Sequence, residues 1–290
     1  MKTITYGEKI SKNLIIALGY FDAVHKGHAL VIGEAVRVAK EKNLSSAVLI
    51  FTGGKSGSDV FTLNERIEKI SSLGVDFIIV KSLDKAFMGK SKEEFLTELN
   101  SNYNVFGVVS GEDFTFGKNA EGTVQTLVGF FGKDKVFTEK LLGDGQEKFS
   151  SSKIKIALKN GDIKSANYYL GSNYFISGKV LKGKGLGRTL GFPTANFSIE
   201  SEKFEIKHGV YKTFVIIGGK KYLSITNFGA QPTVNGESVV VETYIKDFSG
   251  DLYDKDLTVY FEDFLREVKK FSSIEELKIQ LEKDKRCLDD

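Results

Sequence analysis

Cysteine is almost absent from this sequence, and its scarcity limits both the fold class and the compartment. Cys287 is the one cysteine among 290 residues, so no internal disulfide can form. Disulfide-stapled secreted scaffolds are thereby excluded, and a single thiol is typical of proteins from a reducing cytoplasm. The polar residues Glu8, Lys9 and Ser11 follow soon after Met1, which is not the pattern of a secretion signal. We therefore expect a cytoplasmic protein.

Long apolar runs and a strong excess of one charge are also missing. No apolar stretch approaches the roughly 20 residues of a membrane span, so we expect no membrane partner. The 41 basic and 38 acidic residues give a net charge of +3, which does not favour a general nucleic-acid binder. Hydrophobic residues make up 41% and charged residues 27% of a chain long enough for two domains. The composition predicts a soluble, globular protein.

Apolar runs alternate with helical patterns through the first half of the chain. Strands are predicted at residues 14–19, 47–51, 76–80, 105–109 and 135–138, with helices between them at about 27–39, 63–73, 91–99 and 121–131. This alternation favours a parallel, doubly wound sheet of Rossmann-like type. Two further helices are predicted at 150–158 and 162–170, before Gly171.

The pattern changes after Gly171, where strands follow one another with few helical stretches. They are predicted at residues 174–181, 194–198, 209–217, 221–228, 238–246 and 257–262. Such a run is typical of a small closed antiparallel β-barrel, here followed by a terminal helix from Ser273 to about Arg286. We therefore predict an α/β domain at 1–171 and a six-stranded barrel domain at 172–290.

Two of the three histidines, His25 and His28, lie between the first predicted strand and the helix that begins near Gly27. The amides and the dipole of a helix N-terminus favour an anion there, and imidazole N–H groups can donate to phosphate oxygens. A pair of surface histidines is the plainer alternative. Their clustering in one short motif favours function, and the motif resembles the HxGH signature of nucleotidyltransferases.

A second chemical motif combines glycines at alternate positions with a proline-containing segment. Gly183, Gly185 and Gly187 let the backbone approach a bound group, and Arg188 offers a planar fork of donors to phosphate. Farther on, Thr194 and Asn196 point the same way on an extended strand. Their hydroxyl and amide oxygens suit a hydrated Mg²⁺ and the phosphates that it bridges.

Glu242 lies in a strand whose two faces are both largely apolar. It shares a face with Val240 and Tyr244, while Val241 and Ile245 take the other. A rim carboxylate paired with lysine is the commoner fate of a glutamate. A partly buried carboxylate beside a metal pair, however, suits a general base.

Together these motifs resemble the bifunctional riboflavin kinase/FAD synthetase family of prokaryotes over nearly the whole chain. Residues 108–117 are similar to its flavin-side loop, residues 150–155 to its helix start near the ATP phosphates, and residues 241–253 to its kinase segment. The resemblance implies phosphorylation of riboflavin to FMN by ATP in the C-terminal domain. It also implies adenylylation of FMN to FAD, with release of pyrophosphate, in the N-terminal domain.

The resemblance also implies a set of site residues. Glu242 would be the kinase base, His25 and His28 would act in adenylyl transfer, and Mg²⁺ would be held by Thr194 and Asn196. The implied ATP-binding residues are Gly19, Phe21, Asp22, Gly27, Ser151, Lys153, Gly183, Gly185, Gly187, Arg188, Thr194 and Asn196. The implied flavin-binding residues are Asp113, Phe114, Phe116, Asp251, Tyr253 and Arg266.

The N-terminal half departs from the family pattern at three places. Ala23 stands where the family has glycine, Lys153 replaces an arginine, and residues 51–55 replace a Phe-x-Pro-His-Pro segment. One alternative is therefore a protein with a single efficient activity, and another is a flavin-binding regulator without turnover. An RNA-binding barrel is a third, although interleaved basic and aromatic residues are lacking.

Overall fold

The computed structural model describes residues 1–53, 58–140, 143–144, 147–182, 186–233 and 236–289. By their internal contacts these residues form two compact units, Met1–Ser151 and Ser152–Asp290, which are described one at a time. Among the described residues, no helix is long and apolar enough to cross a membrane.

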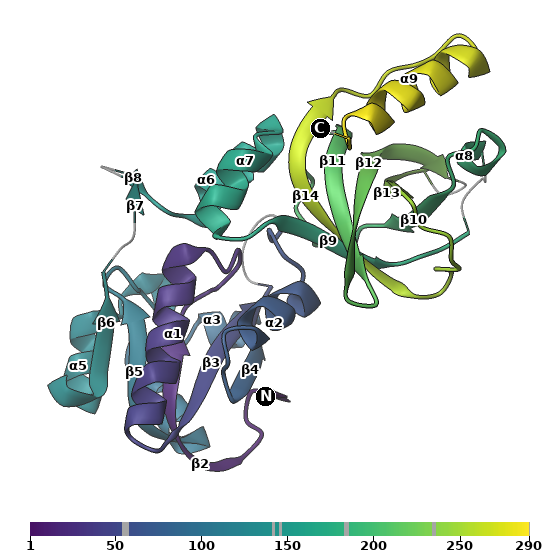
Figure 1. Ribbon diagram of the computed structural model, residues 1–290. Coiled ribbons are helices and arrows are strands. Elements are labelled where there is room, and N and C mark those ends of the chain that lie inside the picture. The colour runs from purple at the N-terminus through teal and green to yellow at the C-terminus, as the bar shows by residue number, and fades with distance from the viewer. Residues whose placement is uncertain (54–57, 141–142, 145–146, 183–185, 234–235, 290) are drawn as a thin grey trace. The chain divides into compact units, whose positions relative to one another are not determined.

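The first unit is built on a parallel sheet of six described strands in the order β1-β4-β3-β2-β5-β6 (Figure 1). The strands are β1 Lys2–Thr5, β2 Ile10–Leu18, β3 Ser45–Thr52, β4 Phe77–Ser82, β5 Tyr103–Gly111 and β6 Val136–Glu139. The helices are α1 Lys26–Glu41, α2 Leu63–Ser71, α3 Lys85–Met88, α4 Lys92–Asn102 and α5 Val124–Phe131, with 3-10 turns at Lys118–Ala120 and Lys133–Lys135. A short antiparallel pair, β7 Gly143–Asp144 and β8 Glu147–Lys148, follows.

Helices cover both faces of this sheet because its central strands are apolar on both sides. Within β2, Ile15 and Ala17 pack in a core with α1, whereas Leu14 and Ile16 pack in a second core with α4. Near-continuous apolar strands of this kind are what a doubly covered parallel sheet requires. The predicted Rossmann-like layering is therefore confirmed.

The order of the strands fixes where a ligand can bind. From β2 the chain winds outward through β3 and β4, then returns to the other side of β2 to form β5 and β6. The loops after β2 and β5 thus leave adjacent strands in opposite directions, and ligands of open α/β sheets bind in the crevice between such loops. Residues 19–25 and 112–117 occupy these two loops.

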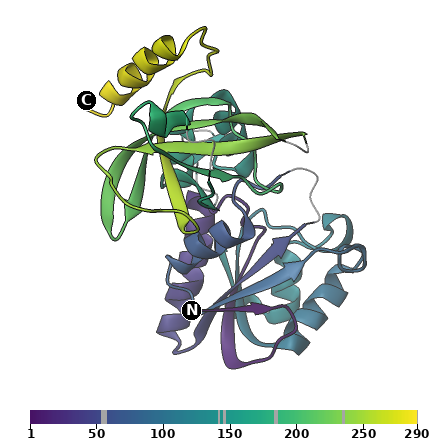
Figure 2. The same ribbon diagram turned by 90° about the vertical axis from the view of Figure 1, so that its right-hand side faces the viewer.

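The second unit is an antiparallel barrel, drawn from a second side in Figure 2. Its strands, labelled in Figure 1, follow the order β10-β13-β12-β11-β14-β9. Its described strands are β9 Tyr174–Lys179, β10 Thr194–Ser198, β11 Gly209–Ile217, β12 Lys220–Thr233, β13 Gly236–Ile245 and β14 Asp256–Arg266. A bridge between Leu181 and Asn196 joins the two edges of the sheet. The helices are α6 Ser151–Asn160, α7 Ile163–Leu170, α8 Leu186–Thr189 and α9 Ile274–Arg286.

Helix α7 packs on the barrel. The side-chain amide of Asn167 donates to the backbone oxygen of Phe261 at 2.9 Å and accepts from the Tyr174 amide at 2.6 Å. The compact units consequently divide at Ser151, ahead of the functional boundary that the sequence places near Gly171. The sequence pattern also missed β1, α3 and α8, which are too short to give a periodic signal.

A chain of hydroxyl groups crosses the barrel core. Thr213 contacts Ser224 at 2.7 Å and Thr226 at 2.8 Å, and Thr226 contacts Thr243 at 2.9 Å. All four side chains are fully buried. Because each hydroxyl both donates and accepts, the chain satisfies polar groups that would otherwise destabilise the core.

We predict that Thr226→Val destabilises the barrel by about 1–3 kcal/mol, because valine keeps the shape but leaves two buried hydroxyls without their shared partner. Thr226→Ser keeps the hydroxyl and should cost less. Thermal inactivation of FMN formation measures the effect. FAD formation from supplied FMN serves as the internal control, and a valine variant as stable as wild type would contradict this account of the hydroxyl chain.

Candidate active sites

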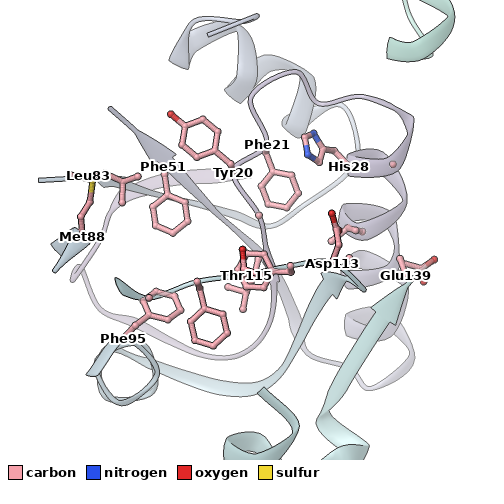
Figure 3. Close-up of a pocket in the computed structure, with 18 of the residues that line it drawn as sticks. Tyr20, Phe21, His28, Phe51, Leu83, Met88, Phe95, Asp113, Thr115 and Glu139 are labelled. Atoms are coloured by element: carbon pink, nitrogen blue, oxygen red, sulfur yellow. The ribbon is translucent and has the colours of Figure 1, made fainter. Parts of the chain in front are cut away.

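The first unit contains a cavity of about 650 Å³ at the crevice between the loops after β2 and β5 (Figure 3). One end is apolar, with Phe51, Leu83, Met88 and Phe95, and the other is polar, with His28 and Asp113. Such a division suits a ligand with a flat apolar ring at one end and a polar group at the other.

The apolar end is largely aromatic. Phe114 stacks on Phe116 with ring centres 5.6 Å apart, and Phe95 lies 5.4 Å from Phe116. Phe51 and Phe87 also line this end. Aromatic walls of this kind pack well against a planar ring system. The structure thus brings the predicted flavin residues Phe114 and Phe116 together.

The polar end is formed by the loop after β2 and the start of α1. Gly19, Phe21, Gly27 and His28 all line it. A Cβ atom at Gly19 would lie 2.7 Å from the Phe21 ring, so glycine is required for the close turn. Gly27 and His28 belong to the first turn of α1, so this end of the cavity meets the positive end of the helix dipole.

The two histidines have different positions in this motif. His25 is the N-cap of α1, and its Nδ1 accepts a hydrogen bond from the His28 amide at 3.3 Å. The two rings are stacked with centres 3.7 Å apart, and His28 alone lines the cavity. Burial, assisted by the positive charge of Lys148, lowers the pKa of His25 to about 4. His25 is therefore neutral at pH 7, and its ring packs against the ring of His28, which lines the cavity.

Asp22 also lies behind the cavity wall. It is buried, and its carboxylate accepts a hydrogen bond from the Val60 amide at 2.6 Å, which ties the loop after β2 to the segment before α2. Of its neighbours, Phe21 and Val24 have positive φ angles of 53° and 43°. Ala23 is not among the described residues with positive φ, so alanine replaces the family glycine there without backbone strain.

The segment that departs from Phe-x-Pro-His-Pro is only partly described, since Gly54 and Lys55 lie outside the described residues. On its described side, the Gly53 carbonyl accepts from the Tyr20 hydroxyl at 3.0 Å. The buried guanidinium of Arg66 donates to the Phe51 carbonyl at 2.8 Å. These bonds fix the start of the segment against the loop after β2.

Asp113 and Glu139 bring negative charge to the polar end of the cavity. Asp113 forms an ion pair with Lys148. Burial and the nearby Glu34 carboxylate raise the pKa of Glu139. Sequence reasoning missed Glu139, whose position at the end of β6 beside β5 is its only signal. The predicted ATP residues Ser151 and Lys153 lie at the start of α6, where the two units divide, and their roles stay predictions.

The second unit contains a cavity of about 280 Å³ on the outer face of the barrel. Thr194, Glu242 and Tyr244 line it on the side of β10 and β13, and Val210 and Ile225 line it on the side of β11 and β12. Leu277 and Leu281 of helix α9 also line it. The cavity therefore runs from a polar part around Glu242 to an apolar part beneath the terminal helix.

The polar part is a hydrogen-bonded group on neighbouring strands. The Thr194 hydroxyl donates to a Glu242 carboxylate oxygen at 3.0 Å, and the Asn196 amide donates to the Thr194 hydroxyl at 3.2 Å. Asn196 lies directly opposite Glu242 in the register of β10 and β13. The predicted metal pair and the predicted base are thus brought together.

These oxygens fit a magnesium ion by their chemistry. Mg²⁺ prefers hard oxygen ligands and keeps several waters, so one or two protein oxygens beside substrate phosphates suffice. The hydroxyl of Thr194 and the side-chain carbonyl of Asn196 are such donors. Among the described residues no group of three or more His, Cys, Asp or Glu side chains could hold a metal instead.

The phosphate-side loop is described only in part. Gly183 and Gly185 lie outside the described residues. At Gly187 a Cβ atom would lie 2.4 Å from the Phe192 carbonyl oxygen, which explains the need for glycine. Arg188 donates to the Tyr253 hydroxyl at 3.3 Å.

Of the three predicted flavin residues of this unit, one lies at the cavity. Asp251 accepts from the Tyr253 amide at 2.9 Å, and neither of these two residues lines the cavity. Arg266 does line it, but its guanidinium is held by the buried carboxylate of Asp284 at 2.6 Å and fastens α9 to the barrel. Sequence reasoning missed Asp284 and Asn227, whose positions follow from tertiary packing and strand register.

Comparison with known proteins finds a separate family match for each half of the chain. A riboflavin kinase family model matches residues 170–289, and an FAD synthetase family model matches residues 7–153. The bifunctional riboflavin kinase/FMN adenylyltransferase of Bacillus subtilis is 36% identical over 93% of this chain and 90% of its own. The protein of the same name from Escherichia coli K12 is 30% identical, with the same coverage of the two chains.

A solved structure from Streptococcus pneumoniae, described as a macrolide-efflux protein, also resembles the chain. It has a TM-score of 0.88 and 28% identity, and the match covers 99% of each chain. The two family models together, and the curated relatives individually, match the sequence of this chain over both units. The chain therefore belongs to the bifunctional riboflavin kinase/FMN adenylyltransferase family, and it has the riboflavin kinase and FMN adenylyltransferase activities of that family.

Proposed function

We propose that the kinase reaction takes place in the barrel cavity, with Glu242 as the general base. Its carboxylate accepts the proton of the riboflavin 5′-hydroxyl as that oxygen attacks the γ-phosphorus of ATP. The hydrogen bond from Thr194 to Glu242 at 3.0 Å is the observation that supports this proposal most directly, because it places a carboxylate beside a candidate metal donor. In this reaction class the protein acts mainly by positioning and charge neutralisation.

Thr194 and Asn196 would hold Mg²⁺, which supplies charge neutralisation at the ATP phosphates when it is bound. Gly187 lines the cavity, and Arg188 beside it offers the phosphate chain a cationic fork. The Tyr253 hydroxyl holds Arg188 in this region, so we assign Tyr253 to the phosphate side of the site. The apolar part of the cavity beneath α9 would receive the flavin ring.

Adenylyl transfer is assigned to the cavity of the first unit. The flavin ring of FMN would lie at the aromatic end, and its phosphate would attack the α-phosphorus of ATP at the polar end, with pyrophosphate leaving. His28 lines that end and donates from its imidazole to phosphate oxygens, assisted by the first turn of α1. Neutral His25 keeps His28 in place through their stacked rings.

The sequence also leaves open a regulator that binds flavin without turnover, and the activities of the family argue against it. It would need an aromatic or apolar cavity but no carboxylate that accepts a hydrogen bond from a candidate metal donor. The Thr194–Glu242 hydrogen bond therefore favours catalysis over binding alone.

The first prediction concerns Glu242. Glu242→Gln keeps the shape of the side chain but cannot accept the hydroxyl proton, so FMN formation should fall about 10²- to 10⁴-fold at saturating substrates. Riboflavin affinity, measured by fluorescence quenching, should change little. Glu262→Gln is the matched control, because Glu262 of β14 only pairs with Lys221 at 2.9 Å. A Glu242→Gln variant with near wild-type turnover would remove Glu242 from the mechanism.

The second prediction concerns His28. His28→Ala should reduce FAD formation from FMN by at least about 10²-fold, because it removes a donor at the transferred phosphates. FMN formation from riboflavin should persist, since that reaction runs in the other unit. His208→Ala is the control, as His208 is exposed and pairs with Glu205. Equal loss of both activities in a folded variant would refute the assignment.

The third prediction uses the low pKa of His25. The unfolded chain binds a proton at the ordinary histidine pKa of about 6.5, whereas folded His25 resists protonation down to about 4. Stability should therefore fall by about 2 kcal/mol between pH 7 and pH 5. His25→Asn keeps an N-cap acceptor but removes the titration. Thermal inactivation of FAD formation at the two pH values should show a smaller shift for this variant, and an equal shift would be evidence against a buried neutral His25.

A further inference from the structure

Asn227 of β12 is a polar residue in the barrel cavity to which the proposed mechanism gives no role. The register of β12 and β13 places it directly opposite Glu242, just as the register of β10 and β13 places Asn196 opposite Glu242 on the other side. Residues directly opposite in antiparallel strands project to the same face of the sheet. The three side chains therefore form a row of amide, carboxylate and amide across three strands.

The two amides differ in what they contact. Asn196 donates to Thr194, and Thr194 in turn donates to Glu242. The side chain of Asn227 makes no hydrogen bond with any of the residues that the structure describes, and it lines the cavity with Glu242. An amide has two donors and one acceptor oxygen, so a half-buried one in a cavity wall is suited to a ligand hydroxyl.

The position of Asn227 in the cavity indicates which part of a bound flavin it would contact. Successive strands lie about 4.8 Å apart, so Asn227 is one strand away from the base, on the side opposite the metal pair. On that same side the wall becomes apolar, with Ile225, Val210 and Leu281. A ribityl chain running from the base towards the flavin ring would pass Asn227 with its secondary hydroxyl next to the reacting one.

We propose that Asn227 binds the 4′-hydroxyl of riboflavin and thereby holds the reacting 5′-hydroxyl against Glu242. This proposal rests on the role of Glu242 as base. Asn227 recognises the sugar-alcohol chain, and it makes the kinase site selective for flavins that carry a hydroxyl at this carbon. The amide donates to, and its oxygen accepts from, the same hydroxyl group.

The test compares riboflavin with 4′-deoxyriboflavin as substrates of the full chain. Wild type should use riboflavin with a kcat/KM about 10- to 100-fold higher than that of the deoxy compound, because the deoxy compound leaves the amide unpaired. Asn227→Ala should lower kcat/KM for riboflavin by a similar factor. On 4′-deoxyriboflavin it should change kcat/KM less than about 3-fold, since the contact is already missing there.

Ile225→Val is the matched control, because Ile225 lies on the same face of β12, opposite Tyr244, and also lines the cavity. It should affect both flavins equally. Equal losses on both flavins in Asn227→Ala would overturn the proposal and indicate a structural role or an effect on Glu242. Should the alanine variant fail to fold, Asn227→Ser, which keeps a shorter polar group, should lower the selectivity part-way. A serine variant with full wild-type selectivity would likewise overturn the proposal.

The selectivity measured for Asn227 does not depend on whether Glu242 is the general base. Failure of the base assignment would appear as retained turnover in Glu242→Gln. The ratio of the two flavins compares substrates within one variant and reports on Asn227 whichever group removes the proton.

Discussion

The register between β13 and its two neighbours is the constraint on which the kinase site depends. Side chains alternate between the faces of a strand, so a slip of one residue would move Glu242 into the barrel core and Thr243 to the cavity. The hydrogen bond between the buried hydroxyls of Thr226 and Thr243 opposes such a slip, because a shifted register would break this bond inside the apolar core. The same register brings Asn196 and Asn227 to either side of Glu242.

In the first unit, the strand order rather than the register of neighbouring strands brings the cavity residues together. Its strand order makes the loops after β2 and β5 diverge, and the crevice between them is lined by Gly19 and Phe21 of one loop and by Phe114 and Phe116 of the other. A neutral histidine, His25, caps the N-terminus of α1 beside this crevice. Each unit thus joins a flat apolar surface to a polar end suited to phosphate, as a flavin nucleotide and ATP together require.

Periodicity predicted the layering of both units, local spacing singled out His25 and His28, and the family resemblance added Glu242 to Thr194 and Asn196. They could not predict the partners that tertiary folding supplies. Asp284 meets Arg266 only because α9 folds back on the barrel, and the prediction of Arg266 as a flavin-binding residue did not include this contact. The hydrogen bond between Asp22, a predicted ATP-binding residue, and the Val60 amide is likewise a contact that only the folded chain supplies. Ala23 raised doubt as a lost glycine, whereas positive φ angles fall on its neighbours Phe21 and Val24.

The central claim is that one chain carries two flavin-modifying sites, each within its own unit. A time course of the purified protein with riboflavin, ATP and Mg²⁺, with riboflavin, FMN and FAD separated by chromatography, tests it most directly. The account predicts that FMN appears first and that FAD follows at its expense, with pyrophosphate released in step with FAD. Accumulation of FMN without FAD, or no conversion of riboflavin at all, would contradict it.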